Sequence, residues 1–391
     1  MLKPLNELKS DISLELKDVL NMVKEILSKN AVEKPVIIDE ENNVKKNAEI
    51  LYALYYLGTH LVLTSYKDAG ILTPLESLGF YDDVKGNSIR VYRSTMELLY
   101  RGWPTPLVLL RSLSNSKIRV WAKLESYNPF SNSIKDRAGW YMFKKALEKG
   151  LKITAIYEAT STNTGLALAA LAAIHRIKAR FYIPSTIQKV SDILLKILGA
   201  EVIRMLYRIT MEYLDLVDKY ARRNGATHLN QFINDANFEV HLKFTAKELD
   251  YQLRNANIQP TVIIGGIGTS GHMSAIAFYF KSRFSEKVKI FCVQPAKDSR
   301  GILGIRRIET GMKWIHWVDI DGIMDVKYHE AIESAIKIAK KEGILIGLSS
   351  GAVVAAFEKL LKNQNIDEGD FVLIFPDHGF KYIEQFQEYL R

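Results

Sequence analysis

The chain carries, at Ser126–Arg137, the stretch SYNPFSNSIKDR, whose central residue for the fold and the chemistry is Lys135. Small and turn-forming residues surround this lysine, and a run of helical character begins at Ala138. A loop that ends at a helix start can screen an amine from water and hold it for imine formation with an aldehyde. Because the chain is rich in lysine, a solvated surface charge is the default interpretation of any single one. Motifs further along the chain decide between these two interpretations.

The second motif is ATSTNTG at Ala159–Gly165, which follows an apolar run around Tyr157 and precedes an alanine-rich helical segment. Hydroxyl groups and free backbone N–H groups at a helix start suit a carboxylate. Thr164 or Asn163 could equally serve only as a helix cap. On its own, the motif leaves both roles open.

The third motif is GGIGTSGHMS at Gly265–Ser274, directly after the apolar run TVII. Its glycines let successive N–H groups point inward, and the helix that follows adds its positive end, which favours a phosphate. The loop lacks the lysine of a nucleotide P-loop and the spacing of G-x-G-x-x-G, so it fits one small phosphomonoester better than a dinucleotide. A plain glycine-rich turn is the alternative. A fourth element, GLSSGA at Gly347–Ala352, offers hydroxyl groups that could reach a ring nitrogen or cap the next helix.

From Arg119 onward, short apolar runs alternate with helical segments. This alternation predicts parallel sheets with helices on both faces, and ligands gather at the carboxyl ends of such strands. The expected strands are ITAIYEA, ARFYIP, EVIRML, TVIIGG, IFCVQP and FVLIFP, and the expected helices are 165–176, 187–198, 210–224 and 236–255.

The first part of the chain shows a different pattern. Residues 12–27 repeat apolar positions at helical spacing, a second helix is expected over 45–57, and 33–43 is expected to be a looser connection. No constellation of chemical groups occurs before about residue 95. Residues 1–95 are therefore predicted to form a helical extension that packs on the body or on a partner subunit.

Composition limits the possible functions. The apolar fraction of 48% and charged fraction of 25% are ordinary for a soluble globular protein of 391 residues. The net charge of +9 is dispersed and no nucleic-acid recognition motif accompanies it, so attraction of anionic substrates is favoured over nucleic-acid binding. Cys292 is the single cysteine, which excludes an intrachain disulfide and a multi-cysteine metal site, and its apolar neighbours indicate a buried strand residue. The first thirty residues are unlike a secretory signal and the run 166–174 is too short to cross a bilayer, so a cytoplasmic protein without membrane association is expected.

In this order, the four motifs resemble the fold-type II pyridoxal-phosphate (PLP) enzymes, specifically the cysteine synthase family. The resemblance runs from Gly102, where GWPTPLV begins, to Tyr382, where PDHGFKY ends. The segments most similar to the archaeal O-phosphoserine sulfhydrylases are SYNPFSNSIKDR, HLNQFINDANFE (228–239), GTSGHMS (268–274), QPA (294–296) and GIRRIETG (304–311). The resemblance implies an α/β fold of two domains with mostly parallel sheets: a large cofactor-binding domain of residues 96–130 and 226–391, and a small mobile domain of residues 131–225.

The resemblance also implies a role for each matching residue, with PLP as the cofactor and Lys135 as the amine that binds its aldehyde. The expected cofactor contacts are Asn163 at the phenolic oxygen, Ser349 at the pyridine nitrogen, and Gly268, Thr269, Ser270, Gly271 and His272 at the phosphate. The expected substrate contacts are Thr160, Ser161 and Gln231 at the carboxylate and Arg306 at the phosphate of O-phosphoserine. Thr162 departs from the family pattern, because acetylserine-using relatives usually carry glycine there.

The implied reaction is the β-replacement of the phosphate of O-phospho-L-serine by sulfide, which gives L-cysteine, in a homodimeric enzyme. Lys135 would remove the Cα proton and return it. O-acetylserine sulfhydrylase, cystathionine β-synthase, threonine synthase and serine or threonine dehydratase activities remain alternatives, because a fold does not fix a substrate. A non-catalytic binding or regulatory protein is the alternative from another class, and retention of Lys135, Asn163 and the 268–272 loop argues against it.

Overall fold

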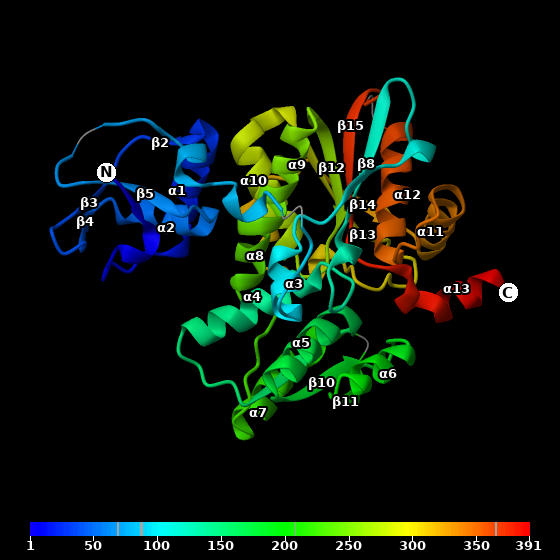
Figure 1. Ribbon diagram of the computed structural model, residues 1–391. Coiled ribbons are helices and arrows are strands. Elements are labelled where there is room, and N and C mark those ends of the chain that lie inside the picture. The colour runs from blue at the N-terminus through cyan, green and yellow to red at the C-terminus, as the bar shows by residue number, and fades with distance from the viewer. Residues whose placement is uncertain (69, 87–88, 208, 364–365) are drawn as a thin grey trace.

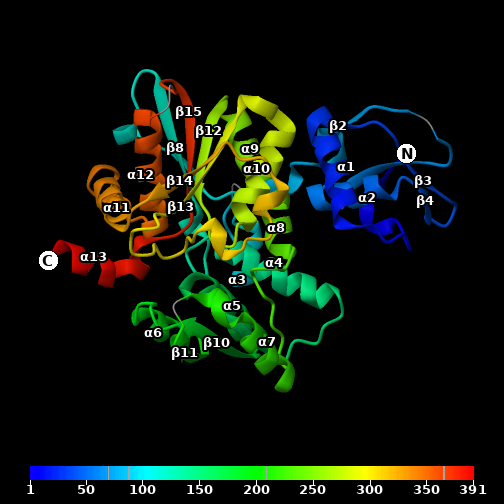
Figure 2. The same cartoon turned by 180° about the vertical axis from the view of Figure 1, so that it is seen from behind.

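The computed structural model describes residues 1–68, 70–86, 89–207, 209–363 and 366–391. The remaining positions fall within the predicted extension and domains and lie outside the described residues. A six-stranded sheet forms the middle of the molecule, a three-stranded sheet lies beside it, and the N-terminal extension packs at another side (Figure 1). The view from behind shows the same three parts and places the two chain ends far apart (Figure 2). The expected α/β class is confirmed.

The six-stranded sheet has the order β14-β13-β12-β15-β8-β7. Its strands are β7 (Leu107–Leu109), β8 (Ile118–Leu124), β12 (Pro260–Gly266), β13 (Lys289–Pro295), β14 (Gly322–Val326) and β15 (Gly369–Phe375). Neighbouring strands are parallel except β7, which runs antiparallel to β8. Every strand expected in this part of the chain is present, because a strand buried on both faces is a nearly continuous apolar run.

Helices cover both faces of this sheet. One face carries α11 (Tyr328–Glu342) and α12 (Leu348–Asn363), and the other carries α8 (Ala236–Val240), the π-helical segment η7 (His241–Ala246), α9 (Lys247–Asn255) and α10 (Gly271–Phe284). Alternation along the strands separates the two cores: Ile263 and Val372 face the α10 side, whereas Val262 and Phe371 face the α12 side. The predicted single helix over 236–255 is therefore interrupted by a π-helical turn.

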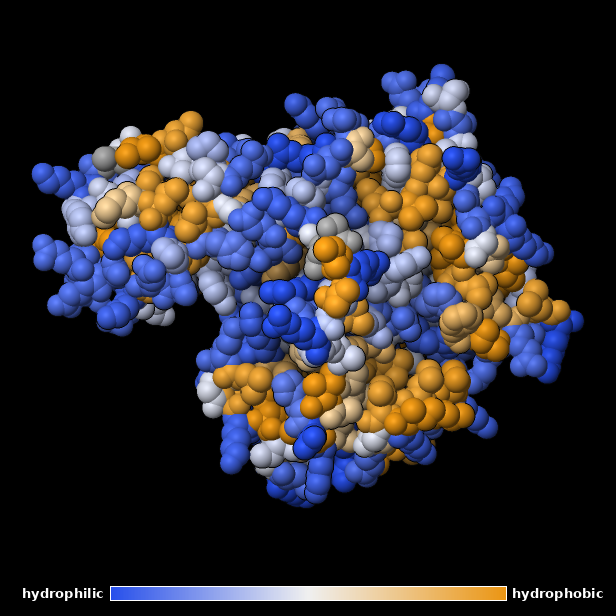
Figure 3. All heavy atoms as spheres, in the orientation of Figure 1, coloured by the Kyte–Doolittle hydropathy of each residue, from blue (hydrophilic) through white to orange (hydrophobic). Residues whose placement is uncertain are grey.

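The three-stranded sheet is parallel, with the order β11-β10-β9. Its strands are β9 (Ala155–Ala159), β10 (Lys178–Pro184) and β11 (Glu201–Met205), all expected from the sequence. Its helices are α4 (Lys135–Glu148), α5 (Thr162–His175) and α6 (Val190–Ile197) on one side and α7 (Leu214–Arg223) on the other. Apolar side chains reach the surface around α5 and α6 (Figure 3), where Ile193 and Ile197 are exposed. This sheet lies within the segment expected to be mobile, and that mobility stays a prediction.

The N-terminal extension contains the two expected helices, α1 (Leu16–Lys29) and α2 (Ala48–Leu57). The expectation that it is simply helical was incomplete, since a four-stranded sheet accompanies the helices and one of its strands lies in the segment 33–43. The strands of the extension are β1 (Leu2–Pro4), β3 (Val36–Ile38), β4 (Val44–Lys46) and β5 (Leu61–Ser65), with β2 (Ala31–Val32) paired to β6 (Thr73–Pro74). Runs of two to five residues are too short to show an alternation in the sequence.

The extension shares a hydrophobic core with the body. Val23 and Leu27 of α1 belong to the same apolar cluster as Ile276 and Phe280 of α10. The extension was predicted to pack on the body or on a partner subunit, and the structure shows it packed on the body of the same chain. In the described part of the chain, no helix combines the length and the apolar character that a bilayer span requires.

Candidate active site

Lys135 is the first residue of α4, and the loop before it is held from two sides. The Asp136 carboxylate accepts hydrogen bonds from the backbone N–H groups of Phe130, at 2.7 Å, and Ser131, at 2.9 Å. Lys381, from the short helix η11 (Gly379–Tyr382) that follows β15, donates to the carbonyl of Ser131 at 2.7 Å. The sequence SYNPFSNS therefore forms a fixed loop, and the lysine starts from a defined position.

The amine of Lys135 lies in a crowded environment. Its side chain keeps some accessible surface, but burial lowers its pKa to about 8, an effect that the nearby carboxylate of Asp377 partly opposes. No described residue forms a hydrogen bond or an ion pair with its Nζ. At pH 7 roughly a tenth of such an amine is neutral, far more than for an ordinary lysine. The amine is thus suited to act as a nucleophile and as a base.

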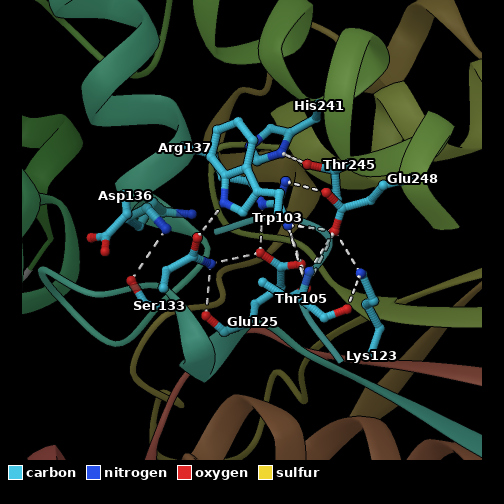
Figure 4. Close-up of polar contacts among 12 residues, drawn as sticks. Trp103, Thr105, Lys123, Glu125, Ser133, Asp136, Arg137, His241, Thr245 and Glu248 are labelled. Carbon is cyan, nitrogen blue, oxygen red and sulfur yellow. Dashed lines mark hydrogen bonds and ion pairs between the residues drawn. The ribbon is translucent and has the colours of Figure 1, made fainter. Parts of the chain in front are cut away.

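A cluster of four buried charges anchors α4 two residues after this lysine. Arg137 donates through Nε to Glu125, at 2.7 Å, and through Nη1 to Glu248, at 2.9 Å. Lys123 donates to the same Glu248, and all four side chains are fully buried. Figure 4 shows these side chains turned toward one another beside Trp103. Because the two cations and two anions balance, the cluster fixes α4 against β8 and α9 without leaving an unpaired buried charge.

The loop expected to bind phosphate joins β12 to α10. Ser270 stands immediately before α10 in the left-handed region, at φ 73°, and Gly271 begins the helix. A Cβ atom at Gly268 would lie 2.6 Å from the carbonyl oxygen of Gly304, and one at Gly271 would lie 2.7 Å from Asn237 Oδ1. Only glycine fits at these two positions. The loop therefore offers free N–H groups at the positive end of a 14-residue helix.

His272 lies in the first turn of α10 and is buried. Burial and the nearby Lys135 amine lower its pKa to about 3, so the imidazole is neutral at pH 7. His241 from the π-helical segment lies beside it, with the ring centroids 5.8 Å apart, and its Nδ1 is 2.9 Å from the hydroxyl of Thr245. No sequence motif pointed to His241, because the π-helical turn that places it has no signature.

The residues expected to hold a carboxylate are brought together. Thr164 donates to Gln231 Oε1 at 2.7 Å, and Gln231 Nε2 lies 3.4 Å from the hydroxyl of Thr160. Ser161 directly precedes α5, next to Thr160. The second motif and the Gln231 segment, which are far apart in the sequence, thus form one group of hydroxyl and amide donors.

Two residues that the sequence did not reveal support this group. The buried carboxylate of Glu158 accepts the backbone N–H groups of residues 229–231, at 3.0 to 3.1 Å, and so shapes the turn that carries Gln231. Asn237 donates to the carbonyl of Gln231 at 2.7 Å and to the hydroxyl of Thr269 at 3.0 Å. Asn237 therefore ties the carboxylate group to the phosphate loop.

Thr162, the departure from the family pattern, has a structural partner. Its hydroxyl lies 2.6 Å from that of Ser191 on α6. A glycine at this position would lose that contact. The threonine at this position therefore links the start of α5 to α6.

Arg306 lies against the phosphate loop. It donates through Nε to the carbonyl of Gly268 at 2.7 Å and through Nη2 to the carbonyl of Gly311 at 2.8 Å. Its guanidinium carbon is 5.1 Å from the ring centroid of Phe232, the neighbour of Gln231. The residue is thus positioned between the phosphate loop and the carboxylate group.

Arg306 differs from its neighbours in charge pairing. Arg300 pairs with Glu388 at 2.8 Å and Arg307 pairs with Glu309 at 2.9 Å. No carboxylate among the described residues pairs with Arg306, and burial lowers its pKa to about 10. An anion bound beside Arg306 would supply the missing counter-charge.

Asn163 and Ser349 complete the set of expected residues. Asn163 donates through Nδ2 to Asp377 Oδ2 at 2.8 Å. Ser349 is buried in the first turn of α12, where a Cβ atom on Gly304 would lie 3.5 Å from its Oγ. Asp377 lies in PDHGFKY, which had marked only the end of the resemblance.

Comparison with known proteins places the chain in a family. Residues 98–377 match the family model "Pyridoxal-phosphate dependent enzyme". The cysteine synthase of Buchnera aphidicola subsp. Schizaphis graminum is 35% identical over 304 residues, which cover 71% of this chain and 91% of that protein. The chain belongs to the cysteine synthase family of PLP-dependent enzymes.

Further matches agree with this assignment. Cysteine synthase A of Escherichia coli K12 is 32% identical over 299 residues, which cover 71% of this chain and 91% of that protein. The crystal structure of a hydrogen sulfide-producing enzyme from Fusobacterium nucleatum superimposes with a TM-score of 0.65 at 29% identity, and covers 75% of this chain and all of that one. As in other members of the family, the cofactor is PLP.

The site residues fit this cofactor. Three of the expected cofactor contacts carry buried polar atoms that have no hydrogen-bond partner among the described residues, namely Asn163 Oδ1, Ser270 Oγ and both ring nitrogens of His272. Such atoms are rare in folded proteins unless a ligand or water satisfies them. They accompany an amine with a lowered pKa and a glycine-rich helix start, which are the groups that an aldehyde and a phosphate require. Lys135 would hold the aldehyde end and residues 268–272 the phosphate of PLP.

Proposed function

We propose that this family member is a PLP-dependent cysteine synthase that converts O-phospho-L-serine and sulfide to L-cysteine and phosphate. The observation that carries the choice of substrate is the unpaired charge of Arg306 next to the phosphate loop. A phosphate group would satisfy that charge and accept from the planar guanidinium, whereas a neutral acetyl ester would satisfy neither. One charge-assisted hydrogen bond contributes about 1.5–3 kcal/mol, which corresponds to a preference of about tenfold or more.

Lys135 supplies the proton transfers in this proposal. Bound at this site, PLP withdraws electrons from the attached amino acid, which acidifies its Cα proton and eases departure of a group from Cβ. The Lys135 amine takes that proton and later returns it to Cα. It must be neutral to act as the base, and its pKa of about 8 supports this role near neutral pH.

The other residues orient the substrate around this amine. Thr160, Ser161 and Gln231 bind the carboxylate, and Ser349 offers the cofactor ring a neutral hydroxyl rather than a carboxylate. The Cβ–O bond breaks with its electron pair leaving on phosphate, and a lone pair of sulfide forms the new Cβ–S bond. Arg306 stabilises the charge on the departing phosphate.

The test is a comparison of three substrates. Purified PLP-loaded protein is given sulfide with O-phosphoserine, O-acetylserine or serine, and the cysteine formed is measured. We expect kcat/KM to be at least about tenfold higher for O-phosphoserine than for O-acetylserine. Equal values, or a preference for O-acetylserine, would contradict the proposed substrate.

The same preparation also tests the alternative that this chain is a non-catalytic binding protein on the same scaffold. The catalytic proposal requires a visible absorbance band from bound cofactor, loss of this band in Lys135→Ala, and turnover in the wild type. Cofactor binding without turnover of any of the three substrates would favour the binding protein. We further propose a homodimer, and a monomeric mass in light scattering would contradict it.

A further inference from the structure

Asp377 lies two residues beyond the carboxyl end of β15, next to the lysine loop. Its backbone pairs with that of Ser133, and the carbonyl of Pro376 accepts from the N–H of Ile134 at 2.8 Å. The Asp377 side chain has no accessible surface. A buried carboxylate thus lies beside the site, and its backbone partner Ser133 is two residues before Lys135, where α4 begins.

Three donors approach one oxygen of this carboxylate. Oδ2 accepts from Asn163 Nδ2 at 2.8 Å and from the hydroxyl of Tyr382, while Lys381 Nζ lies 3.7 Å away. The other oxygen, Oδ1, is buried and has no hydrogen-bond partner in the part of the chain that the structure describes. Gly347 makes room for it, since a Cβ atom there would lie 1.9 Å from Oδ1. The surroundings therefore hold the carboxylate in one orientation.

This contact determines which way Asn163 faces. An ionised carboxylate only accepts hydrogen bonds, so the amide must turn its NH₂ group toward Asp377. One N–H of that group binds Oδ2 at 2.8 Å, and the same amide also interacts with the hydroxyl of Tyr382. A neutral amide at position 377 would accept either orientation of Asn163, because it can both donate and accept.

The charge of Asp377 also acts on Lys135. Burial lowers the pKa of the Lys135 amine, and the Asp377 carboxylate opposes that effect by favouring the protonated form. Among the described residues, the other titratable groups that face these two are Lys381, Tyr382 and His378 from η11 and the residue before it, and His272 and His241 from the α10 side. All three histidines have pKa values lowered by burial, so none of them supplies a compensating charge at neutral pH.

We propose that Asp377 is a positioning residue of the reaction, which fixes the orientation of the Asn163 amide and whose negative charge stabilises Lys135 in the state that carries the substrate proton. The inference rests on the proposed role of Lys135. It assigns a mechanistic role to a residue outside the cofactor and substrate contacts described above.

The test removes the charge while keeping the shape. In Asp377→Asn, the acid limb of the pH profile of kcat should move to lower pH by about one unit, because the lysine loses its proton more easily. The visible band of the PLP-loaded protein, titrated without substrate, should shift in the same direction. If neither the limb nor the band moves while the protein remains folded, the proposal is wrong.

Tyr382→Phe serves as the matched control, because it removes a donor to the carboxylate but keeps the charge. The carboxylate then has one fewer hydrogen bond and acts more strongly on the lysine, so the limb and the band should move to higher pH. A downward shift like that of Asp377→Asn would mean that both variants merely loosen the site, and would overturn the proposal. If Asp377→Asn proves insoluble, Tyr382→Phe decides: an upward shift supports the proposal, and no shift or a downward one refutes it.

The band titration separates this inference from the proposed function. Wild-type protein that binds PLP but turns over none of the three substrates would refute the proposed function. The band of the two variants would still report whether Asp377 acts on Lys135.

Discussion

Replacing Arg306 by alanine tests the substrate assignment most directly. The side chain has an Nε contact to Gly268, two Nη1 contacts to Thr310 and one Nη2 contact to Gly311. Since a guanidinium has five N–H donors, these four contacts leave at least one donor on Nη2 for a bound anion.

The expected magnitude follows from that free donor. A single charge-assisted hydrogen bond contributes about 1.5–3 kcal/mol, so Arg306→Ala should lower kcat/KM for O-phosphoserine by about tenfold to a hundredfold. The value for O-acetylserine should change far less, because its ester carries no charge. The ratio of the two values is therefore the quantity to measure.

Arg307→Ala is the matched control, since this neighbouring arginine already pairs with Glu309 and Asp325. It should leave the substrate ratio unchanged. Because Arg306 also braces the carbonyl of Gly268, the PLP dissociation constant of each variant must be measured alongside. If Arg306→Ala lowers kcat/KM equally for both substrates while PLP is fully bound, then the arginine supports the loop and does not recognise phosphate.

Three other predictions concern residues away from the phosphate loop. Glu158→Gln should raise the substrate KM and lower the free energy of unfolding by about 1–3 kcal/mol, because the 229–231 turn loses a carboxylate acceptor. An unchanged KM in steady-state assays would contradict this prediction. Burial lowers the pKa of Lys247 from 10.5 to about 7, so between these two pH values the unfolded chain binds more protons than the folded one. The free energy of unfolding should therefore rise with pH across that window. Denaturant midpoints measured at several pH values should show a smaller slope for Lys247→Met. Burial raises the pKa of the Cys292 thiol to about 12, so a maleimide should label the native protein only as fast as it unfolds, and rapid labelling at pH 7 would refute this.

The sheets and the loops at their ends were predictable from sequence because they rest on local patterns. Apolar runs such as TVIIGG and FVLIFP became β12 and β15, and the loop after β12 carries the glycines that had marked it. The motifs are each contained in one short segment whose residues must be neighbours to act. The approach of Thr160 to Gln231 followed from the resemblance, and no local pattern would have predicted it.

The supporting residues were not predictable, because their partners come from distant parts of the chain. Asp377 meets Asn163 across 214 residues, and Glu158 meets Gln231 across 73. Glu158 belongs to no motif, and PDHGFKY did not mark the Asp377 carboxylate as a partner of Asn163, because an isolated carboxylate in a sequence is usually a solvated one. The short strands of the extension were missed for another reason, since β3 and β4 have three residues each and their pairing depends on tertiary packing.

The balanced cluster of Lys123, Glu125, Arg137 and Glu248 limits how descendants of this chain can diverge. Losing any single member strands an opposite charge in the interior at a cost of about 3–5 kcal/mol, a large share of the stability of a typical domain. An apolar interior of the same volume would be tolerated, but the path to it one substitution at a time crosses sequences that fold poorly. Lineages should therefore inherit or exchange these positions in oppositely charged pairs, and the lysine that begins α4 would keep its anchor only where both members of a pair remain.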